Sequence, residues 1–203
     1  MNTVTAPRSD AAPILNAWQG PFGGVPPFDR VTPALLQPAL ESAMVLQLAA
    51  IDRIAADPAA PTFANTIAAL EKSGRELDRV SAVFGVYTST LNDAAVQAVE
   101  REMAPKLAAF SDRISQNEPL FARITAVYAT RTTADLSSEQ QRLTWLYYTN
   151  FLRAGAQLDA DAKQRLSAIN QRLATLYTTF SHNILAEAND QALLLRAGSL
   201  AAP

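Results

Sequence analysis

The sequence contains no cysteine and a single histidine, and these two scarcities narrow the chemistry open to the chain. Without cysteine there can be no disulfide, no thiolate metal site and no cysteine nucleophile. With His182 as the only histidine, a zinc site would need further ligands, and neither an HExxH pattern nor a GxSxG nucleophile elbow is present. We therefore expect no catalytic residue and no metal ligand in this chain, and we expect His182 to be a packed or surface histidine.

Neither charge sign dominates, and no long hydrophobic run is present. The chain has 17 Lys and Arg against 19 Asp and Glu, for a formal net charge of -2. Basic residues alternate with acidic ones and form no cluster beside exposed aromatics, so we expect no nucleic-acid partner. No run approaches the ~18 to 20 apolar residues of a spanning helix, and the first 18 residues lack the apolar core of a signal peptide. We expect no membrane partner and a cytoplasmic location.

Proline and glycine are concentrated at the start of the chain. Nine of the 12 prolines precede Thr62, and three of the seven glycines lie in Gly20–Gly24. We predict that residues 1–17 are disordered and that an arm beginning at Trp18 is ordered against helices, because Trp18, Phe22 and Phe28 are costly to leave in water. No Lys-Ser or Lys-Thr follows the glycines and no strand precedes them, so we interpret them as a structural turn rather than a phosphate loop.

Apolar residues at helical spacing dominate the rest of the sequence, of which 49% of residues are hydrophobic. Two stripes with steps of three and four predict two antiparallel helices, with Asp93 as the N-cap of the second, on which the other helices pack. Ser73-Gly74 predicts a kink or break before the first stripe, and Pro105 predicts a bend in the second helix. The stripes are Leu77, Val80, Phe84, Tyr87 and Leu91, then Val96, Val99, Met103, Leu107, Phe110 and Ile114.

Cap residues mark further helices on both sides of this hairpin. Thr32 with Pro33 opens a helix to about residue 56, and Thr62 or Asn65 caps the next. A short helix covers residues 120–128. Ser137 with Gln140 forms a capping box for a helix that Gly155 ends, and Asp159 caps a long helix to about residue 188. The residues expected to face inward are Leu143, Leu146, Tyr147, Asn150, Phe151 and Ala154, then Leu166, Ile169, Leu173, Leu176, Phe180 and Ile184.

These segments predict an all-α fold: an irregular array of about six to seven antiparallel helices with a Pro/Gly-rich N-terminal arm. Residues 18–190 would form one helical domain, and residues 191–203 a tail.

Two groups of side chains are candidates for chemistry. Glu100 with Glu102, and Asp159 with Asp161, are each two residues apart and diverge on a helix, so we interpret them as solvated or capping charges. The aromatic residues between 145 and 151 fit core packing best. Trp145 and Tyr148 are expected to project away from that packed stripe, which makes them the candidate peptide-contacting residues.

Six segments resemble, in order, the N-terminal helical region of the thimet oligopeptidase family of zinc metallopeptidases, and most closely bacterial peptidyl-dipeptidases and oligopeptidase A. The resemblance covers about Trp18 to Ala188. The segments are WQGPFGGVPPFDRVTPALLQPALESAM, PTFANTIAALEKSGRELDRVSAVF, LNDAAVQAVEREMAPKLAAFSDRI, NEPLFARITAVY, FLRAGAQLD and INQRLATLYTTFSHNI.

The resemblance implies a mostly helical body split by a deep channel, with zinc held by HExxH and a more distant glutamate. That catalytic domain lies downstream of the matched region and is expected to be absent from this chain, so no zinc ligand transfers to any residue. For this chain the resemblance implies one wall of a channel that admits short peptides. The chain would be inactive alone, and its partner would be the missing catalytic domain or a partner chain. The sequence departs from the family pattern from Gln191 onward.

A second interpretation is a stand-alone helical module that binds peptides or another protein without chemistry. A helical region that normally covers a catalytic body should expose apolar surface when that body is absent, so under the first interpretation we expect self-association.

Overall fold

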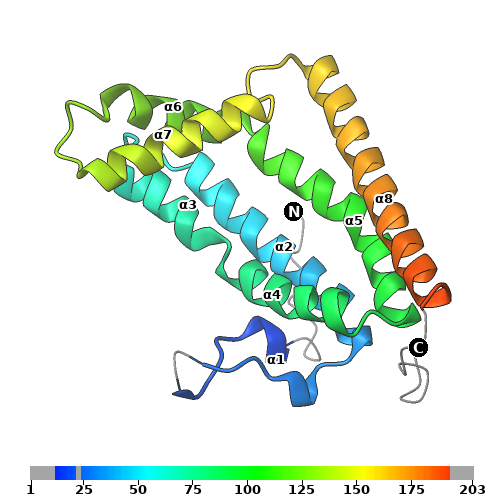
Figure 1. Ribbon diagram of the computed structural model, residues 1–203. Coiled ribbons are helices and arrows are strands. Elements are labelled where there is room, and N and C mark those ends of the chain that lie inside the picture. Colours follow the sequence, from blue (N-terminus) through cyan, green and yellow to red (C-terminus); the bar gives the residue numbers. More distant parts are fainter. Residues whose placement is uncertain (1–11, 22–23, 193–203) are drawn as a thin grey trace, which may run out of the picture.

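Helices account for the whole of the regular structure in residues 12–21 and 24–192, the part of the chain that the computed structural model describes (Figure 1). No β-strand occurs in these residues, and the predicted all-α class is confirmed. Seven helices have six or more residues: α2 Pro33–Ala55, α3 Ala68–Ser73, α4 Arg75–Thr90, α5 Ala94–Ser115, α6 Glu118–Thr130, α7 Ser138–Arg153 and α8 Ala160–Asp190. The shorter elements are α1 Ala12–Leu15, η3 Phe28–Arg30 and η4 Phe63–Ile67.

Part of the N-terminal arm is built into the fold. Ile14 and Leu15 of α1 are buried, so the prediction of disorder does not hold for residues 12–17; residues 1–11, Phe22 and the tail from residue 193 lie outside the described residues. Trp18 is partly buried against the core as expected, whereas Phe28 is exposed. The glycines do form a turn, in which Gly24 has a φ of +111° and its amide donates to the carbonyl of Pro21.

Local capping sets the helix starts where the sequence predicts them. The Asp93 carboxylate accepts from the amides of Ala95 at 3.0 Å and Val96 at 2.9 Å, and the Asp159 carboxylate accepts from Ala162 at 2.8 Å. Ser137 and Gln140 form the expected reciprocal capping box. Each cap satisfies amides that a helix start leaves without an intrahelical partner, so these boundaries are properties of short sequence segments.

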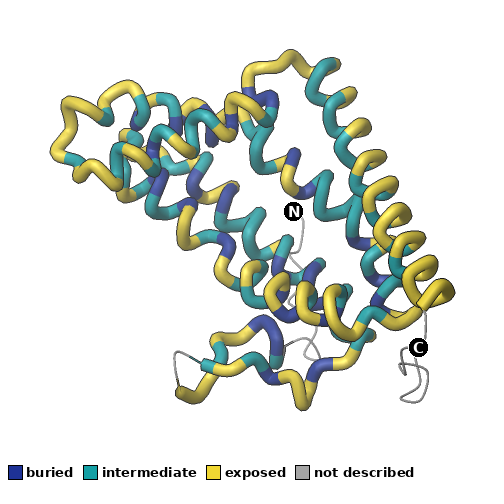
Figure 2. Tube along the Cα trace, viewed as in Figure 1, coloured by how far each residue is buried: buried dark blue, intermediate teal, exposed yellow. Residues whose placement is uncertain are grey.

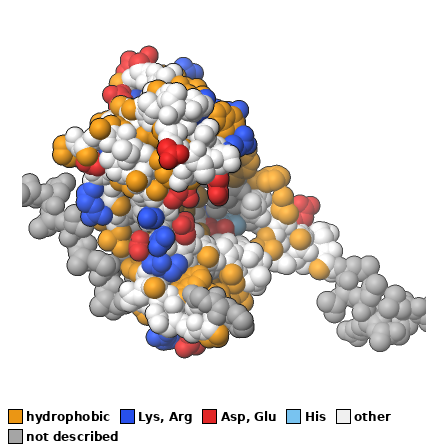
Figure 3. All heavy atoms as spheres, turned by 90° about the vertical axis from the view of Figure 1, so that its left-hand side faces the viewer, with side chains coloured by type: hydrophobic (Ala, Val, Ile, Leu, Met, Phe, Trp, Pro, Cys, Tyr) orange, Lys and Arg blue, Asp and Glu red, His pale blue; other side chains and the backbone are white. Residues whose placement is uncertain are grey.

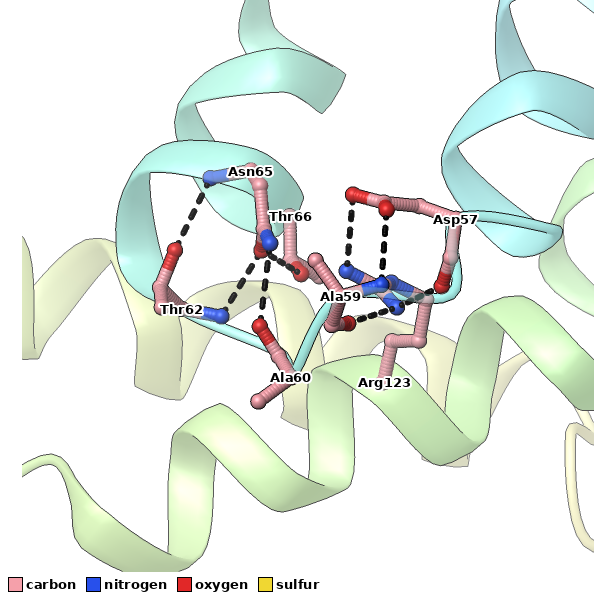
Figure 4. A network of polar contacts seen from close by, with 7 residues as sticks. All are labelled: Asp57, Ala59, Ala60, Thr62, Asn65, Thr66 and Arg123. Carbon is pink, nitrogen blue, oxygen red and sulfur yellow. Dashed lines mark hydrogen bonds and ion pairs between the residues drawn. The ribbon is translucent and has the colours of Figure 1, made fainter.

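The two candidate caps of the segment after α2 act together (Figure 4). The Thr62 hydroxyl accepts from the Asn65 amide at 3.1 Å, and the Asn65 side-chain oxygen accepts from the Thr62 amide at 2.7 Å. The chain then enters η4 and α3, and α3 ends at Ser73, directly before Gly74, as predicted.

The side chain of Arg123 holds the loop between α2 and η4 in place (Figure 4). This buried side chain of α6 donates to the carbonyls of Asp57 at 2.7 Å and Ala59 at 3.0 Å, and it lies 3.4 Å from the Asp57 carboxylate. A buried charge needs such partners. The contact ties a loop to a helix more than 60 residues later.

The helix α2 joins two cores, because its first half packs with α1, α4 and α5 and its second half with η4, α3, α6 and α7 (Figures 1 and 2). Helices α4 and α5 are antiparallel neighbours, but both pack more extensively on α2 than on each other. Most of their predicted stripe is buried or half-buried, and Tyr87 donates from its hydroxyl to the carbonyl of Val31 at 2.8 Å. Leu91 is the exception, with 55% of its surface exposed.

The hydropathy of α2 and the proline within α5 each bear on a prediction from the sequence. With 23 residues and an 18-residue window of mean hydropathy 1.4, α2 is long and apolar enough to cross a membrane, although the sequence shows no unbroken apolar run of that length. The same composition is typical of a core helix, and α2 supplies Leu36, Leu40 and Ile51 to the two cores. Helix α5 continues through Pro105, and the bend there stays a prediction.

Candidate functional site: the outward face of α8 and the aromatic side chains of α7

The longest helix, α8, is placed on the molecule in an unusual way. It has 31 residues, none of them buried, and α5 is its main packing partner (Figures 1 and 2). Amphipathic surface helices normally turn their apolar stripe toward the protein. In α8 the orientation is reversed, as the two faces show.

The face of α8 that meets the rest of the protein is polar. The Asn170 amide nitrogen donates to Asp112 of α5 at 2.7 Å, and the Lys163 ammonium lies 2.6 Å from the Glu118 carboxylate at the start of α6. The hydrogen bond from Lys163 lowers the pKa of Glu118. Asp112 is buried, and its second carboxylate oxygen has no hydrogen-bond partner within the described part of the chain.

His182 belongs to this polar face. Its Nε2 lies 2.7 Å from a carboxylate oxygen of Glu100, and its Nδ1 lies 3.3 Å from a guanidinium nitrogen of Arg101. Asn92 donates to the same Glu100 oxygen at 3.1 Å. His182 is therefore a packed histidine, as expected. Glu100, interpreted from the sequence as a solvated or capping charge, is instead half-buried and bonded; the partners are 82 residues apart, so no local pattern could pair them.

The opposite face of α8 is apolar and exposed. Its six side chains fall within about 100° of the helix circumference at 100° per residue, so they form one continuous stripe. The prediction that five of these residues pack inward, all but Tyr177, is wrong, because the polar contacts with α5 and α6 hold the other face against the protein. Leu166, the sixth residue predicted to face inward, is half-buried. The stripe consists of Ile169 (46% exposed), Leu173 (42%), Leu176 (46%), Tyr177 (68%), Phe180 (63%) and Ile184 (51%).

The aromatic side chains of α7 divide between core and surface. Tyr148 stacks on Tyr128 of α6, with ring centroids 4.0 Å apart and planes at 8°, and also on Phe121 at 5.7 Å. Tyr148 thus packs on the second core, and the expectation that it projects away from the packed side chains is wrong. The inward face of α7 is wider than the stripe of Leu143 and Tyr147, and it includes Tyr148.

The other residues of α7 that were expected to face inward differ in their burial. Phe151 is buried, and Leu143 and Tyr147 pack on the second core as expected. Leu146 and Asn150 were expected inside but are exposed.

Trp145 is the aromatic residue of α7 that does not join the second core. It is half-buried, and the Arg142 guanidinium carbon lies 4.4 Å from its ring centroid, a cation–π contact. The indole ring is thus held at the surface by its own helix. For Trp145 and Tyr148 alike, contact with a peptide stays a prediction.

Tyr147 carries the most perturbed titration in the described residues. Burial, followed by a 2.6 Å hydrogen bond from its hydroxyl to Glu71 of α3, raises its pKa far above the ordinary value of 10.0. A tyrosine held neutral by burial links α7 to α3 and is not poised for proton transfer near neutral pH.

The residues described do not fit a zinc site. No group of three or more His, Asp or Glu side chains is placed to hold a metal in residues 12–21 and 24–192. The pair His182 and Glu100 offers two ligands, while the guanidinium of Arg101 lies against the other ring nitrogen, Nδ1, and would repel a cation. The zinc that the family resemblance implies thus has no ligand set here.

Comparisons with known proteins agree with the resemblance seen in the sequence. No protein-family model matches the chain. It is 36% identical over 174 residues to dipeptidyl carboxypeptidase of Salmonella typhimurium, covering 86% of this chain and 25% of that protein. It is 36% identical over 161 residues to dipeptidyl carboxypeptidase of Escherichia coli, and 25% identical over 173 residues to oligopeptidase A of Haemophilus influenzae, covering 79% and 85% of this chain and 24% of each relative.

The chain therefore spans about a quarter of the length of the curated relatives it matches. The sequence-based identification is confirmed: this chain is a homologue of the dipeptidyl carboxypeptidases and of oligopeptidase A.

Proposed function

We propose that this chain is the helical, substrate-restricting wall of a zinc metallopeptidase that hydrolyses short peptides, of the peptidyl-dipeptidase or oligopeptidase type, and that it has no activity alone. The observation that carries the proposal is the outward apolar face of α8. Homologues more than three times as long contain residues that could cover such a face.

The size of this face indicates how it would be covered. Fully burying a Leu, Ile or Phe side chain contributes roughly 1.5–3 kcal/mol, so six residues with about half of their surface still exposed offer about 6 kcal/mol. Association of separate molecules costs an estimated 4–15 kcal/mol. The face therefore suits docking within one polypeptide, where that cost is small, better than tight binding of an independent protein.

In the proposed enzyme the catalytic chemistry belongs to the remaining three quarters. That part would hold the zinc, which activates water and polarises the peptide carbonyl. The residues of this chain would contribute a surface and a fixed orientation, through the polar contacts between α5 and α8. Cytoplasmic location remains part of the proposal.

The test of inactivity is a hydrolysis assay. The purified chain with zinc should not cleave a quenched fluorescent peptide that Salmonella dipeptidyl carboxypeptidase, the positive control, does cleave. Turnover by this chain that a chelator abolishes would overturn the proposal.

The second candidate is a peptide-binding module without chemistry, and the surface position of Trp145 favours it. Titration calorimetry with short peptides would detect it, with Trp145→Ala as the variant and Leu146→Ala, an exposed neighbour on the same helix, as the control. Heat lost in the Trp145 variant alone would support this candidate, and no heat with any peptide would argue against it.

A further inference from the structure

A second surface feature, distant in sequence from α8, is a groove along the crease between α2 and the pair α3 and α4. Two cavities of about 640 and 480 Å³ adjoin there and share four lining residues, so they form one elongated depression. The shared residues are Ala50, Arg53, Lys72 and Ser73.

Four basic side chains line this groove although they come from three helices: Arg53, Lys72, Arg75 and Arg79. Acidic residues are close by, as is common on this protein; Figure 3 shows one face on which Lys and Arg side chains gather beside acidic ones. The net field of the groove therefore depends on which of its charges are already paired.

The acids that line the groove are paired. Glu76 lies 3.1 Å from Arg79, which also donates to the Leu15 carbonyl at 2.8 Å. Asp57 lies 3.4 Å from the buried Arg123, which does not line the groove.

Three cations are left over. The side chains of Arg53, Lys72 and Arg75 are exposed, and no hydrogen bond or ion pair joins them to another residue of the described ranges. The groove thus carries an uncompensated charge of about +3 in a chain whose formal net charge is -2.

The rest of the lining indicates what kind of anion would fit. Apolar side chains also line the groove, namely Leu15, Leu46 and Ala50 in one cavity and Ile54 and Ala69 in the other. No aromatic side chain lines either cavity, so the stacking platform that single-stranded nucleic acid uses is missing from these linings.

We infer that this groove binds an acidic peptide segment, with carboxylates on Arg53, Lys72 and Arg75 and aliphatic side chains against the apolar lining. The match is one of charge and shape: guanidinium groups take carboxylates in a bidentate manner, and an elongated depression suits an extended chain better than a single ion. The inference goes beyond the proposed function, because binding here needs neither zinc nor a catalytic part.

The experiment measures fluorescence anisotropy of a labelled hexapeptide of alternating glutamate and leucine, titrated with the full 203-residue chain. The variant is Arg53→Gln/Lys72→Gln/Arg75→Gln. The matched control is Arg153→Gln/Arg165→Gln/Arg172→Gln, which removes the same charge from exposed positions of α7 and α8. Circular dichroism checks that both variants are folded.

We expect the groove variant to weaken binding about tenfold or more, since each exposed charge pair contributes up to about a factor of five, and the control to bind like the unaltered chain. Affinity should fall as salt rises from low to physiological strength, and a peptide with glutamine for glutamate should not bind. Equal binding by both variants, or by the glutamine peptide, would overturn the inference. Tighter binding of a single-stranded oligonucleotide than of the acidic peptide would do the same and would assign the groove to nucleic acid.

Discussion

The reversed orientation of α8 predicts that Phe180, an aromatic residue of its exposed stripe, can be made polar at almost no cost in stability. Phe180 is 63% exposed, so about a third of its side chain is in contact with protein. If full burial is worth roughly 1.5–3 kcal/mol, that contact is worth about 1 kcal/mol at most. Glutamine keeps some of the contact through its methylenes and is a slightly better helix former. Phe180→Gln should therefore lower the free energy of unfolding by less than about 1 kcal/mol.

The assay is urea denaturation followed by far-ultraviolet circular dichroism, with Leu120→Ala as the comparison. Leu120 is fully buried in the second core, and its truncation should cost about 2–5 kcal/mol. Phe180→Gln should also reduce the binding of a hydrophobic dye and the self-association of the chain, because it interrupts the exposed stripe.

A loss of stability in Phe180→Gln as large as that in Leu120→Ala would refute the reasoning, since it would place the stripe in the core. Unchanged dye binding would show that the stripe is not the surface the dye detects.

Three further predictions concern the polar contacts that hold the fold. Arg123→Met should lower the free energy of unfolding, measured by urea denaturation, by about 3 kcal/mol, because it leaves the Asp57 and Ala59 carbonyls without their donor. The control, Arg113→Met on the exposed side of α5, should change it by no more than about 0.5 kcal/mol. Equal losses in the two variants would contradict the role of Arg123 in holding the loop. Burial and Glu71 raise the folded-state pKa of Tyr147 above its unfolded value of 10.0, so the unfolded chain loses that proton first and the free energy of unfolding should fall as the pH rises above about 10. In Tyr147→Phe the free energy of unfolding should fall less steeply with pH in this range. An equally steep fall in the variant would contradict the role of Tyr147. His182→Ala should increase hydrogen exchange across α8, because it removes the contacts with Glu100 and Arg101, and His182→Gln should restore part of the protection; exchange unaffected by either would show that these contacts do not hold α8.

What could be predicted from the sequence is what short segments determine. Asp93, Ser137 and Asp159 cap their helices because a side chain reaches an amide two or three residues away, and such geometry depends on few neighbours. The same holds for the break at Gly74 and for the turn that contains Gly24.

What could not be predicted depends on partners far along the chain. Periodicity groups Leu173, Leu176 and Phe180 on one face but does not say whether that face turns inward, which the polar contacts between α5 and α8 decide. The basic groove could not be predicted from the sequence either, because Arg53 and Lys72 line the same cavity only when α2 and α3 pack together.

The central claim is that these residues are one wall of a larger peptidase, and the mass of the native protein tests it most directly. An antibody raised against this region should detect, in source cells, a product more than three times the 21.8 kDa of this chain, because the 174 residues that match make up only 25% of the relative. A native product of 21.8 kDa would contradict the claim and favour the stand-alone module.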